Sequence, residues 1–274
     1  MEQTLVIQLG YRGGDFAGYA EQPGQRTVAG ELRRALETAL RRPVELTCAG
    51  RTDAGVHALA QYVSLPVPSE ELSTASRLQR ALTALTPDDI AIRGLYRAEQ
   101  GFSARFDAQA RAYRYRIACG DAACPVLGWG HVWWLRSASA LDADAMHEAA
   151  QCLLGEHDFR SFCKVSSAEA ILADGRSTSR FLSKVSVSRC IELGEELVAI
   201  DVVGNAFLHN MVRAISGSLV EVGLGRRDAS WLAQALEAKS RNAAGQTAPA
   251  CGLTLERVDY PEGALVKLGA PADH

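Results

Sequence analysis

Apolar runs and amphipathic stretches alternate along the first hundred residues of the chain. Runs of apolar residues predict strands at 5–9, 44–48, 60–67 and 90–96. Apolar side chains spaced three and four apart predict helices over 27–41 and 70–85, the first capped by Thr27 and stopped by Pro43. The order strand, helix, strand, strand, helix, strand is that of a ferredoxin-like unit with helices on one face of an antiparallel sheet.

The second half of the chain shows the same alternation of helices and paired strands, without a visible sequence repeat. Strands are predicted at 110–117, 184–190, 196–203 and 252–258. Amphipathic helices are predicted at 141–154, 205–223 and 228–238. The small, polar residues 166–179 indicate a loop, and residues 261–274 indicate a poorly ordered tail. The chain is therefore predicted to have an α+β fold.

Composition places the chain among globular proteins without defining its partner. Its 274 residues suffice for one large domain or two modest ones. A formal net charge of −3 argues mildly against a nucleic-acid partner, although a local basic cleft is compatible with it. Basic residues cluster at 33–34, 41–42 and 105–116.

Cysteine usage and hydropathy indicate a reduced compartment and no membrane. The seven cysteines are scattered and form no CxxC pair, which is typical of free thiols in the cytoplasm. No apolar run approaches the ~18 residues that span a membrane, and the first residues lack the features of a signal peptide. A zinc site at 119–124 is disfavoured, because the spacing fits no standard site and a fourth ligand is missing. We expect no metal.

The stretch 49–58, Ala-Gly-Arg-Thr-Asp-Ala-Gly-Val-His-Ala, is the strongest candidate for chemistry. It lies between two predicted strands, and its two glycines indicate a tightly shaped loop. Asp53 is able to act as a nucleophile or base, or simply to cap a turn. Arg51 is able to hold a phosphate or to remain a solvated charge. The residues alone leave these alternatives open.

A second candidate is the predicted strand at 110–117, in which tyrosines and arginines alternate. Because side chains two apart share a face of a strand, Tyr113 and Tyr115 lie on one face and Arg114 and Arg116 on the other. The tyrosines either pack in a core or stack on a base, with the arginines binding phosphates in the second case.

Three segments, in register along most of residues 3–260, resemble tRNA pseudouridine synthases of the TruA type. Residues 50–58 resemble the family signature, which implies that Asp53 is the catalytic nucleophile and that Arg51 and His57 contact substrate. The Arg-Ala-Tyr-Arg-Tyr stretch implies that Tyr113 stacks on the target base, and Arg105 survives from the motif upstream of it. Residues 206–213, Ala-Phe-Leu-His-Asn-Met-Val-Arg, imply that Arg213 pairs with the catalytic aspartate.

The resemblance also implies an architecture and an activity. The architecture is two ferredoxin-like halves, 1–104 and 105–260, whose sheets join into one large sheet with the active cleft between them, followed by a tail at 261–274. The activity is isomerisation of uridine to pseudouridine at positions 38, 39 and 40 of the tRNA anticodon arm. The enzyme is then a cytoplasmic homodimer that binds tRNA, needs no cofactor or bound nucleotide, and has no membrane contact.

The chain departs from the family pattern at three places, so a second interpretation stays open. Arg12, Tyr19 and Ser103 replace residues that the family usually carries. The alternative is a non-catalytic or altered-specificity RNA-binding protein of the same fold. An unrelated carboxylate hydrolase is disfavoured, because no second carboxylate or metal cluster accompanies Asp53 in sequence.

Overall fold

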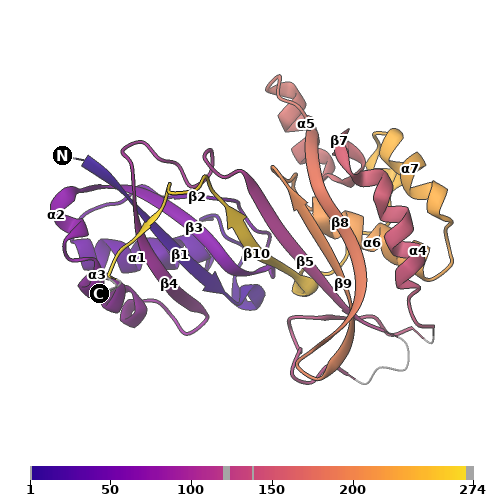
Figure 1. Ribbon diagram of the computed structural model, residues 1–274, viewed down its shortest axis with the longest axis horizontal. Helices are drawn as coiled ribbons and strands as arrows, with labels where there is room; N and C mark the ends of the chain where they lie inside the picture. The colour runs from indigo at the N-terminus through magenta and orange to yellow at the C-terminus, as the bar shows by residue number, and fades with distance from the viewer. Residues whose placement is uncertain (1, 120–123, 138, 270–274) are drawn as a thin grey trace. The chain divides into compact units, whose positions relative to one another are not determined.

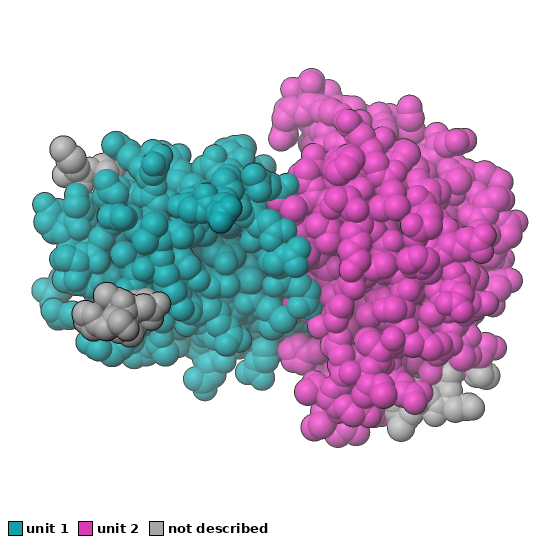
Figure 2. All heavy atoms as spheres, viewed as in Figure 1, with its two compact units in different colours: residues 1–109, 255–274 teal, residues 110–254 magenta. Residues whose placement is uncertain are grey.

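The computed structural model describes residues 2–119, 124–137 and 139–269, and the chain divides into two compact units (Figure 2). Unit 1 contains residues 1–109 and 255–274, and unit 2 contains residues 110–254. Strands and α-helices occur in both units, so the predicted α+β class is confirmed (Figure 1). None of the described helices is long and apolar enough to cross a membrane.

Unit 1 is built on an antiparallel sheet with the order β11-β4-β1-β3, and β2 pairs with β3. Its strands are β1 (Glu2–Tyr11), β2 (Thr47–Cys48), β3 (His57–Pro68), β4 (Ile90–Ala98) and β11 (Val266–Lys267). The register sets Leu5 of the central strand opposite Leu65 of β3 and Arg97 of β4. Both leucines are fully buried, so this strand forms the middle of the core.

The helices of unit 1 begin and end where the sequence gives a local reason. They are α1 (Val28–Leu40), α2 (Ser69–Leu72) and α3 (Ala75–Leu85), with a short 3-10 turn, η1, at Gly13–Asp15. Thr27 caps α1 as predicted, since its hydroxyl accepts from the Gly30 N–H at 3.2 Å. The predicted helix 70–85 is interrupted instead. The hydroxyls of Ser73 and Thr74 bond to carbonyls of the preceding turn and so compete with the helix.

Unit 2 contributes antiparallel strands in the order β5-β9-β8-β7, and β6 pairs in parallel with β5. Its strands are β5 (Ala110–Ala118), β6 (Trp133–Trp134), β7 (Gly155–Asp158), β8 (Ser179–Glu192) and β9 (Glu195–Gly204). Strand β10 (Leu253–Asp259) begins in unit 2 and ends in unit 1.

Most α-helices of unit 2 contact its strands and one another. The helices of this unit are α4 (Ala143–Ala150), α5 (Val165–Ala173), α6 (Met211–Gly223) and α7 (Ala229–Glu237), with short 3-10 turns η2 (Gln151–Leu153), η3 (Phe159–Phe162), η4 (Arg241–Ala243) and η5 (Ala250–Gly252). Helix α4 lies on β8 and contacts α6 and α7 (Figure 1). Asp142 and Asp228 cap α4 and α7 by accepting backbone N–H bonds at 2.9 and 3.0 Å.

Three sequence expectations about local structure were wrong. Residues 166–179 do not form a simple loop, because the alanine-rich run within them forms most of α5. The expected tail is paired in part, since β11 bonds to β4 and the Leu268 N–H donates to Leu95 O at 2.8 Å. The helix expected from residue 205 begins only at Met211, after Asn210 takes a left-handed conformation with φ 65°. The disfavoured zinc segment, 119–124, lies partly outside the described residues.

The arginines of β5 make ion pairs within the sheet of unit 2. Arg114 lies opposite Asp201 in the β5–β9 register, and its Nε is 2.7 Å from Asp201 Oδ1. Arg114 Nη1 also contacts Glu192 Oε1 at 2.9 Å, and Arg116 Nε contacts the other oxygen of Glu192 at 2.6 Å. Burial alone raises the pKa of Asp201, but the bonds and charge of Arg114 outweigh it and hold that pKa below its usual range. These arginines therefore stabilise the sheet.

We expect Asp201→Asn to reduce the free energy of unfolding by about 1–2 kcal/mol at pH 7, because a charged hydrogen-bonded pair is lost at a largely shielded site. The folded-state pKa of Asp201 lies below its unfolded value of about 3.9, so the pair contributes stability above that pH and loses it as pH falls through the folded pKa. Urea denaturation at pH 7 and at pH 3, followed by circular dichroism, measures both effects.

Asp174→Asn is the matched control, since Asp174 forms a 2.7 Å pair with Arg176 in which both side chains are 61% exposed. Exposed pairs contribute little, so we expect a change below about 0.5 kcal/mol. Equal effects of the two substitutions would contradict a structural role for the Arg114–Asp201 pair.

Candidate active site

The Asp53 loop, residues 49–56, connects β2 to β3 in unit 1. A tight turn closes it, because the Val56 N–H donates to Asp53 O at 3.1 Å. Gly55 occupies the third position of this turn with φ 82°, a left-handed value that suits glycine. Asp53 is half-buried at the start of the turn, and Arg51 is exposed. A carboxylate is thus presented at a defined position on a short loop.

Buried polar side chains of β1 and β3 form hydrogen bonds that anchor this loop. The Tyr11 hydroxyl and Thr52 Oγ1 are 2.8 Å apart, and Gln61 Nε2 donates to Gly50 O at 2.6 Å. The Gln61 amide also lies 3.4 Å from the Tyr11 hydroxyl. Burial raises the pKa of Tyr11 far above its usual value, so the phenol stays protonated and neutral. The network therefore holds the residues on either side of Arg51 through bonds that are shielded from water.

The glycine-rich loop 12–19 supports the Asp53 loop from a second direction. The Gly13 N–H donates to His57 Nδ1 at 3.0 Å, which makes that nitrogen the acceptor of the imidazole. A Cβ placed on Gly13 would lie 2.0 Å from Val56 O, so only glycine permits this approach. The Tyr19 N–H donates to Thr52 O at 3.0 Å. The two loops therefore form one backbone-to-backbone contact.

Arg51 and Arg105 are both exposed and both act electrostatically on Cys48, the last residue of β2. Burial raises the pKa of the Cys48 thiol, and the charges of the two arginines oppose that shift only in part. The thiol therefore remains protonated. Arg51 and Arg105, two of the predicted site residues, therefore both lie within electrostatic range of Cys48 in unit 1.

The segment that carries Arg105 is fixed although the side chain itself is exposed. The Ala104 N–H donates to Ser64 Oγ at 3.0 Å, and the Tyr260 hydroxyl donates to Ala104 O at 2.7 Å. The Arg105 guanidinium lies 5.3 Å from the ring centre of Phe106, which is 78% exposed. A cation and an aromatic ring are thus held together at the surface of unit 1.

Tyr113 lies on β5 of unit 2 and packs against the segment that leads into α6. Its ring meets that of Phe207 edge-on, with centroids 5.0 Å apart, and it is 8% exposed. Arg111 Nη1 donates to Asn205 O at 2.6 Å and ties the same strand to the same segment. Tyr115 is fully buried and donates to Pro249 O at 2.7 Å, so it is a core residue.

Arg213 lies in the first turn of α6, and hydrogen bonds within unit 2 hold its guanidinium. Its Nε donates to Ala248 O at 2.8 Å, and Nη1 donates to Asn210 Oδ1 at 3.1 Å. The Ala248 N–H donates back to Arg213 O at 3.1 Å. Close approach of the chain at residues 246–248 requires Gly217, whose added Cβ would lie 1.8 Å from Gln246 O. The guanidinium is therefore oriented before any substrate arrives.

The predicted site residues fall into two sets. Unit 1 carries Asp53, Arg51, His57 and Arg105, and unit 2 carries Tyr113 and Arg213. Sequence reasoning missed the supporting residues of unit 1, chiefly Tyr11, Gly13 and Gln61. Gln61 did have a signal in the sequence, because a glutamine within a mostly apolar predicted strand needs buried hydrogen-bond partners. In the structure its side chain is 0% exposed. The role of Gly13 had none, since it depends on a contact with a residue 43 positions away, Val56.

Comparisons with known proteins identify the family. A family model described as tRNA pseudouridine synthase matches residues 149–261. A tRNA pseudouridine synthase A from Aeromonas hydrophila is 39% identical over 97% of this chain and 92% of its own length. Proteins of the same name from Streptomyces griseus and Shewanella amazonensis are 41% and 40% identical, over 95% and 94% of this chain and 89% and 93% of their own lengths. The chain therefore belongs to the tRNA pseudouridine synthase family.

A solved structure of an unknown protein from Galdieria sulphuraria covers 98% of this chain and 99% of its own, with a TM-score of 0.23 and 12% identity. At that score the likeness carries no argument.

We expect Gly13→Ala to lower kcat for pseudouridine formation about a hundredfold, because its methyl group displaces the Val56 backbone and with it the Asp53 turn. Gly14→Ala is the matched control, since a Cβ there meets nothing within 4 Å. Turnover of tRNA by both variants, with circular dichroism to verify folding, makes the comparison. Wild-type turnover by a folded Gly13→Ala protein would show that the loop contact does not position Asp53.

Proposed function

We propose that this protein isomerises uridine to pseudouridine at positions 38, 39 and 40 in the anticodon arm of tRNA. The observation that carries the proposal is Asp53, the half-buried carboxylate that two sets of buried contacts hold at the start of a tight turn. Support for the reaction class comes from relatives that are named tRNA pseudouridine synthase A and are about 40% identical over nearly the whole chain.

The proposed reaction changes the connection between base and sugar without changing the atoms of the nucleotide. The bond from N1 of uracil to the ribose breaks, the ring turns, and C5 forms the new bond to the ribose. C5 loses its hydrogen to solvent and N1 gains one, so neither redox change nor group transfer occurs and no cofactor is required. Asp53 acts as the nucleophile, on the ribose or on the ring.

The other predicted residues receive roles that fit their settings. Arg51 is exposed beside Asp53, where it holds a phosphate or fills the space left by a flipped nucleotide. Tyr113 stacks on the flipped base, and Arg213 balances the charge of Asp53. Arg105 binds the RNA at the surface of unit 1. His57 acts on the substrate through the loop, since its Nδ1 is committed to Gly13.

The proposal extends to the oligomeric state and the compartment. The family resemblance favours a cytoplasmic homodimer. Among the described residues of unit 2, Val126, Leu127 and Trp129 are 67–73% exposed, and exposed apolar side chains in one short segment are typical of an interface.

We expect Asp53→Asn to abolish release of tritium from tRNA labelled at uracil C5, because the amide is nearly isosteric but is not a nucleophile. Asp15→Asn is the matched control, since Asp15 is an exposed carboxylate at the end of η1, on the supporting loop. It should release tritium at the wild-type rate. Mapping the modified nucleotides in the same reactions shows whether positions 38, 39 and 40 are used.

Three other outcomes of this experiment reject parts of the proposal. Equal release by wild type and Asp53→Asn would remove Asp53 from the mechanism. Release confined to uridines outside positions 38–40 would reject the proposed target. No release by wild-type protein that still binds tRNA would favour a non-catalytic or altered-specificity RNA-binding protein.

We expect the affinity for tRNA to depend on the aromatic ring of Tyr113. Tyr113→Phe keeps the ring and should bind tRNA as tightly as wild type. Tyr113→Leu removes it and should weaken binding at least about fivefold, since stacking of a base on an aromatic side chain contributes about 1–3 kcal/mol. Fluorescence anisotropy with labelled tRNA measures both dissociation constants. Equal weakening by both substitutions would contradict the stacking role.

A further inference from the structure

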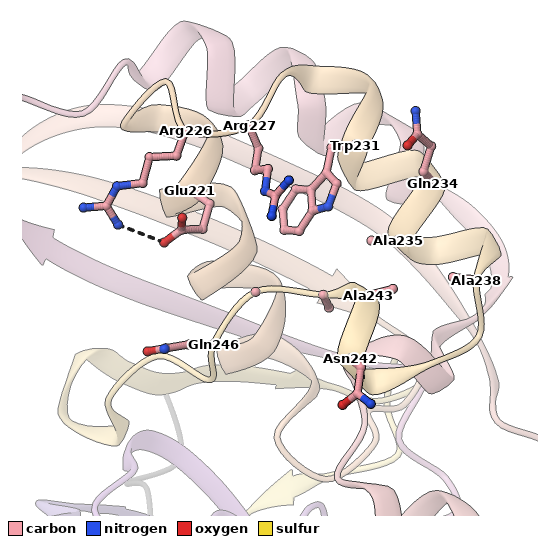
Figure 3. Close-up of a pocket in the computed structure, with 12 residues that line it drawn as sticks. Glu221, Arg226, Arg227, Trp231, Gln234, Ala235, Ala238, Asn242, Ala243 and Gln246 are labelled. Carbon is pink, nitrogen blue, oxygen red and sulfur yellow. Dashed lines mark hydrogen bonds and ion pairs between the residues drawn. The ribbon is translucent and has the colours of Figure 1, made fainter.

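A cavity of about 660 Å³ lies in unit 2, and its lining contains none of the predicted site residues (Figure 3). It is bounded by the C-terminal end of α6, by α7 and by the segment 242–246. Its charged and aromatic lining consists of Glu221, Arg226, Arg227 and Trp231. The amides of Gln234, Asn242 and Gln246 supply hydrogen-bonding groups around them.

The two arginines of this cavity are available to an anion. The Arg227 guanidinium lies 5.2 Å from the ring centre of Trp231 and, among the residues that the structure describes, donates no side-chain hydrogen bond (Figure 3). Arg226 pairs with Glu221 at 3.2 Å, but its side chain is 61% exposed, and pairs of this kind contribute little. The cavity lining therefore carries more positive than negative charge, in a chain whose net charge is −3.

Nearby Asp228 is engaged in the fold. Its Oδ1 accepts from the Trp231 N–H at 3.0 Å and from the Ser230 hydroxyl at 2.6 Å, and so caps α7. Its carboxylate is thus committed to the helix N-terminus beside the cavity.

The cavity shares its framework with Arg213. Helix α6 carries Arg213 in its first turn and Glu221 in its last, and the ten helical steps from Arg213 to Gly223 span about 15 Å. The segment 242–246 lines the cavity, and two residues later Ala248 O accepts from Arg213 Nε. Proteins that bind duplex RNA contact it over about 16 base pairs, so one bound RNA is long enough to reach both places.

We propose that this cavity binds backbone phosphates of the tRNA substrate through Arg226 and Arg227. The inference rests on the proposed function, because it requires RNA to be bound near Arg213. Arg227 keeps its place over Trp231, and Arg226 exchanges its pair with Glu221 for a phosphate oxygen, which a guanidinium binds with two parallel N–H groups. These contacts hold the RNA in register without reading its sequence.

The test measures tRNA affinity as a function of salt for full-length protein. Replacing both arginines, Arg226→Gln with Arg227→Gln, should weaken binding about tenfold at 0.1 M salt. The slope of log affinity against log salt should decrease by about 0.7–0.9 for each lost phosphate contact. Glu221→Gln should have the opposite effect and tighten binding about two- to fivefold, because it removes a negative charge and releases Arg226.

Arg257→Gln is the matched control, since Arg257 is 62% exposed and pairs with Asp259 at 2.6 Å, much as Arg226 pairs with Glu221. Its affinity and salt slope should equal those of wild type. Circular dichroism melting of each variant separates loss of binding from loss of fold. Unchanged affinity and slope in the folded double variant would overturn the proposal. If a lowered melting temperature were its only effect, the arginines would merely stabilise the end of α6.

Pseudouridine formation at saturating tRNA distinguishes failure of this inference from failure of the proposed function. The double variant should reach the wild-type kcat with a raised KM, because the cavity contributes binding and not chemistry. Wild-type protein that forms no pseudouridine would reject the proposed function, while the salt slopes would still decide whether the cavity holds RNA.

Discussion

The close approach of two loop backbones in unit 1 determines where Asp53 lies. The Asp53 loop has no helix or strand of its own, so its shape depends on contacts from outside it. Gly13 and Gly18 bring the glycine-rich loop within reach, since side chains there would meet Val56 O at 2.0 Å and Thr52 O at 3.2 Å. His57 closes the contact by accepting the Gly13 N–H. A carboxylate held in this way meets the precision that nucleophilic catalysis requires.

The residues proposed for unit 2 are positioned by a different device. The β5–β9 ladder fixes Tyr113, and the first turn of α6 fixes Arg213. In unit 2 regular secondary structure therefore positions these side chains, whereas in unit 1 loop packing positions Asp53. The two are linked through Phe207, whose ring contacts that of Tyr113 and whose chain leads into the helix. A shift of α6 would therefore disturb both side chains together.

Sequence patterns predicted those parts of the fold that local interactions determine. The Thr27 cap was predictable because a capping side chain bonds within the first turn of its own helix. Asp53 could be named as a candidate because the residues of its motif are contiguous in the sequence. Two contacts could not be predicted, because each joins segments that are distant in sequence. They are the pairing of β11 with β4 and the contact of Gly13 with Val56. Helix α5 was not predicted, because its serines favour a loop although its alanines favour a helix.

The net charge of −3 does not reveal which arginines pair within the fold and which are exposed. Arg114 and Arg116 looked like phosphate ligands in the sequence, yet both are neutralised by carboxylates of the same sheet. Arg51 and Arg105 are instead exposed on unit 1 beside the Asp53 loop and Phe106. An acidic protein can thus present local positive charge, because screening confines each charge to about 10 Å at 0.1 M salt. The placement of each arginine, which only the folded structure reveals, therefore says more than net charge about where a polyanion can bind.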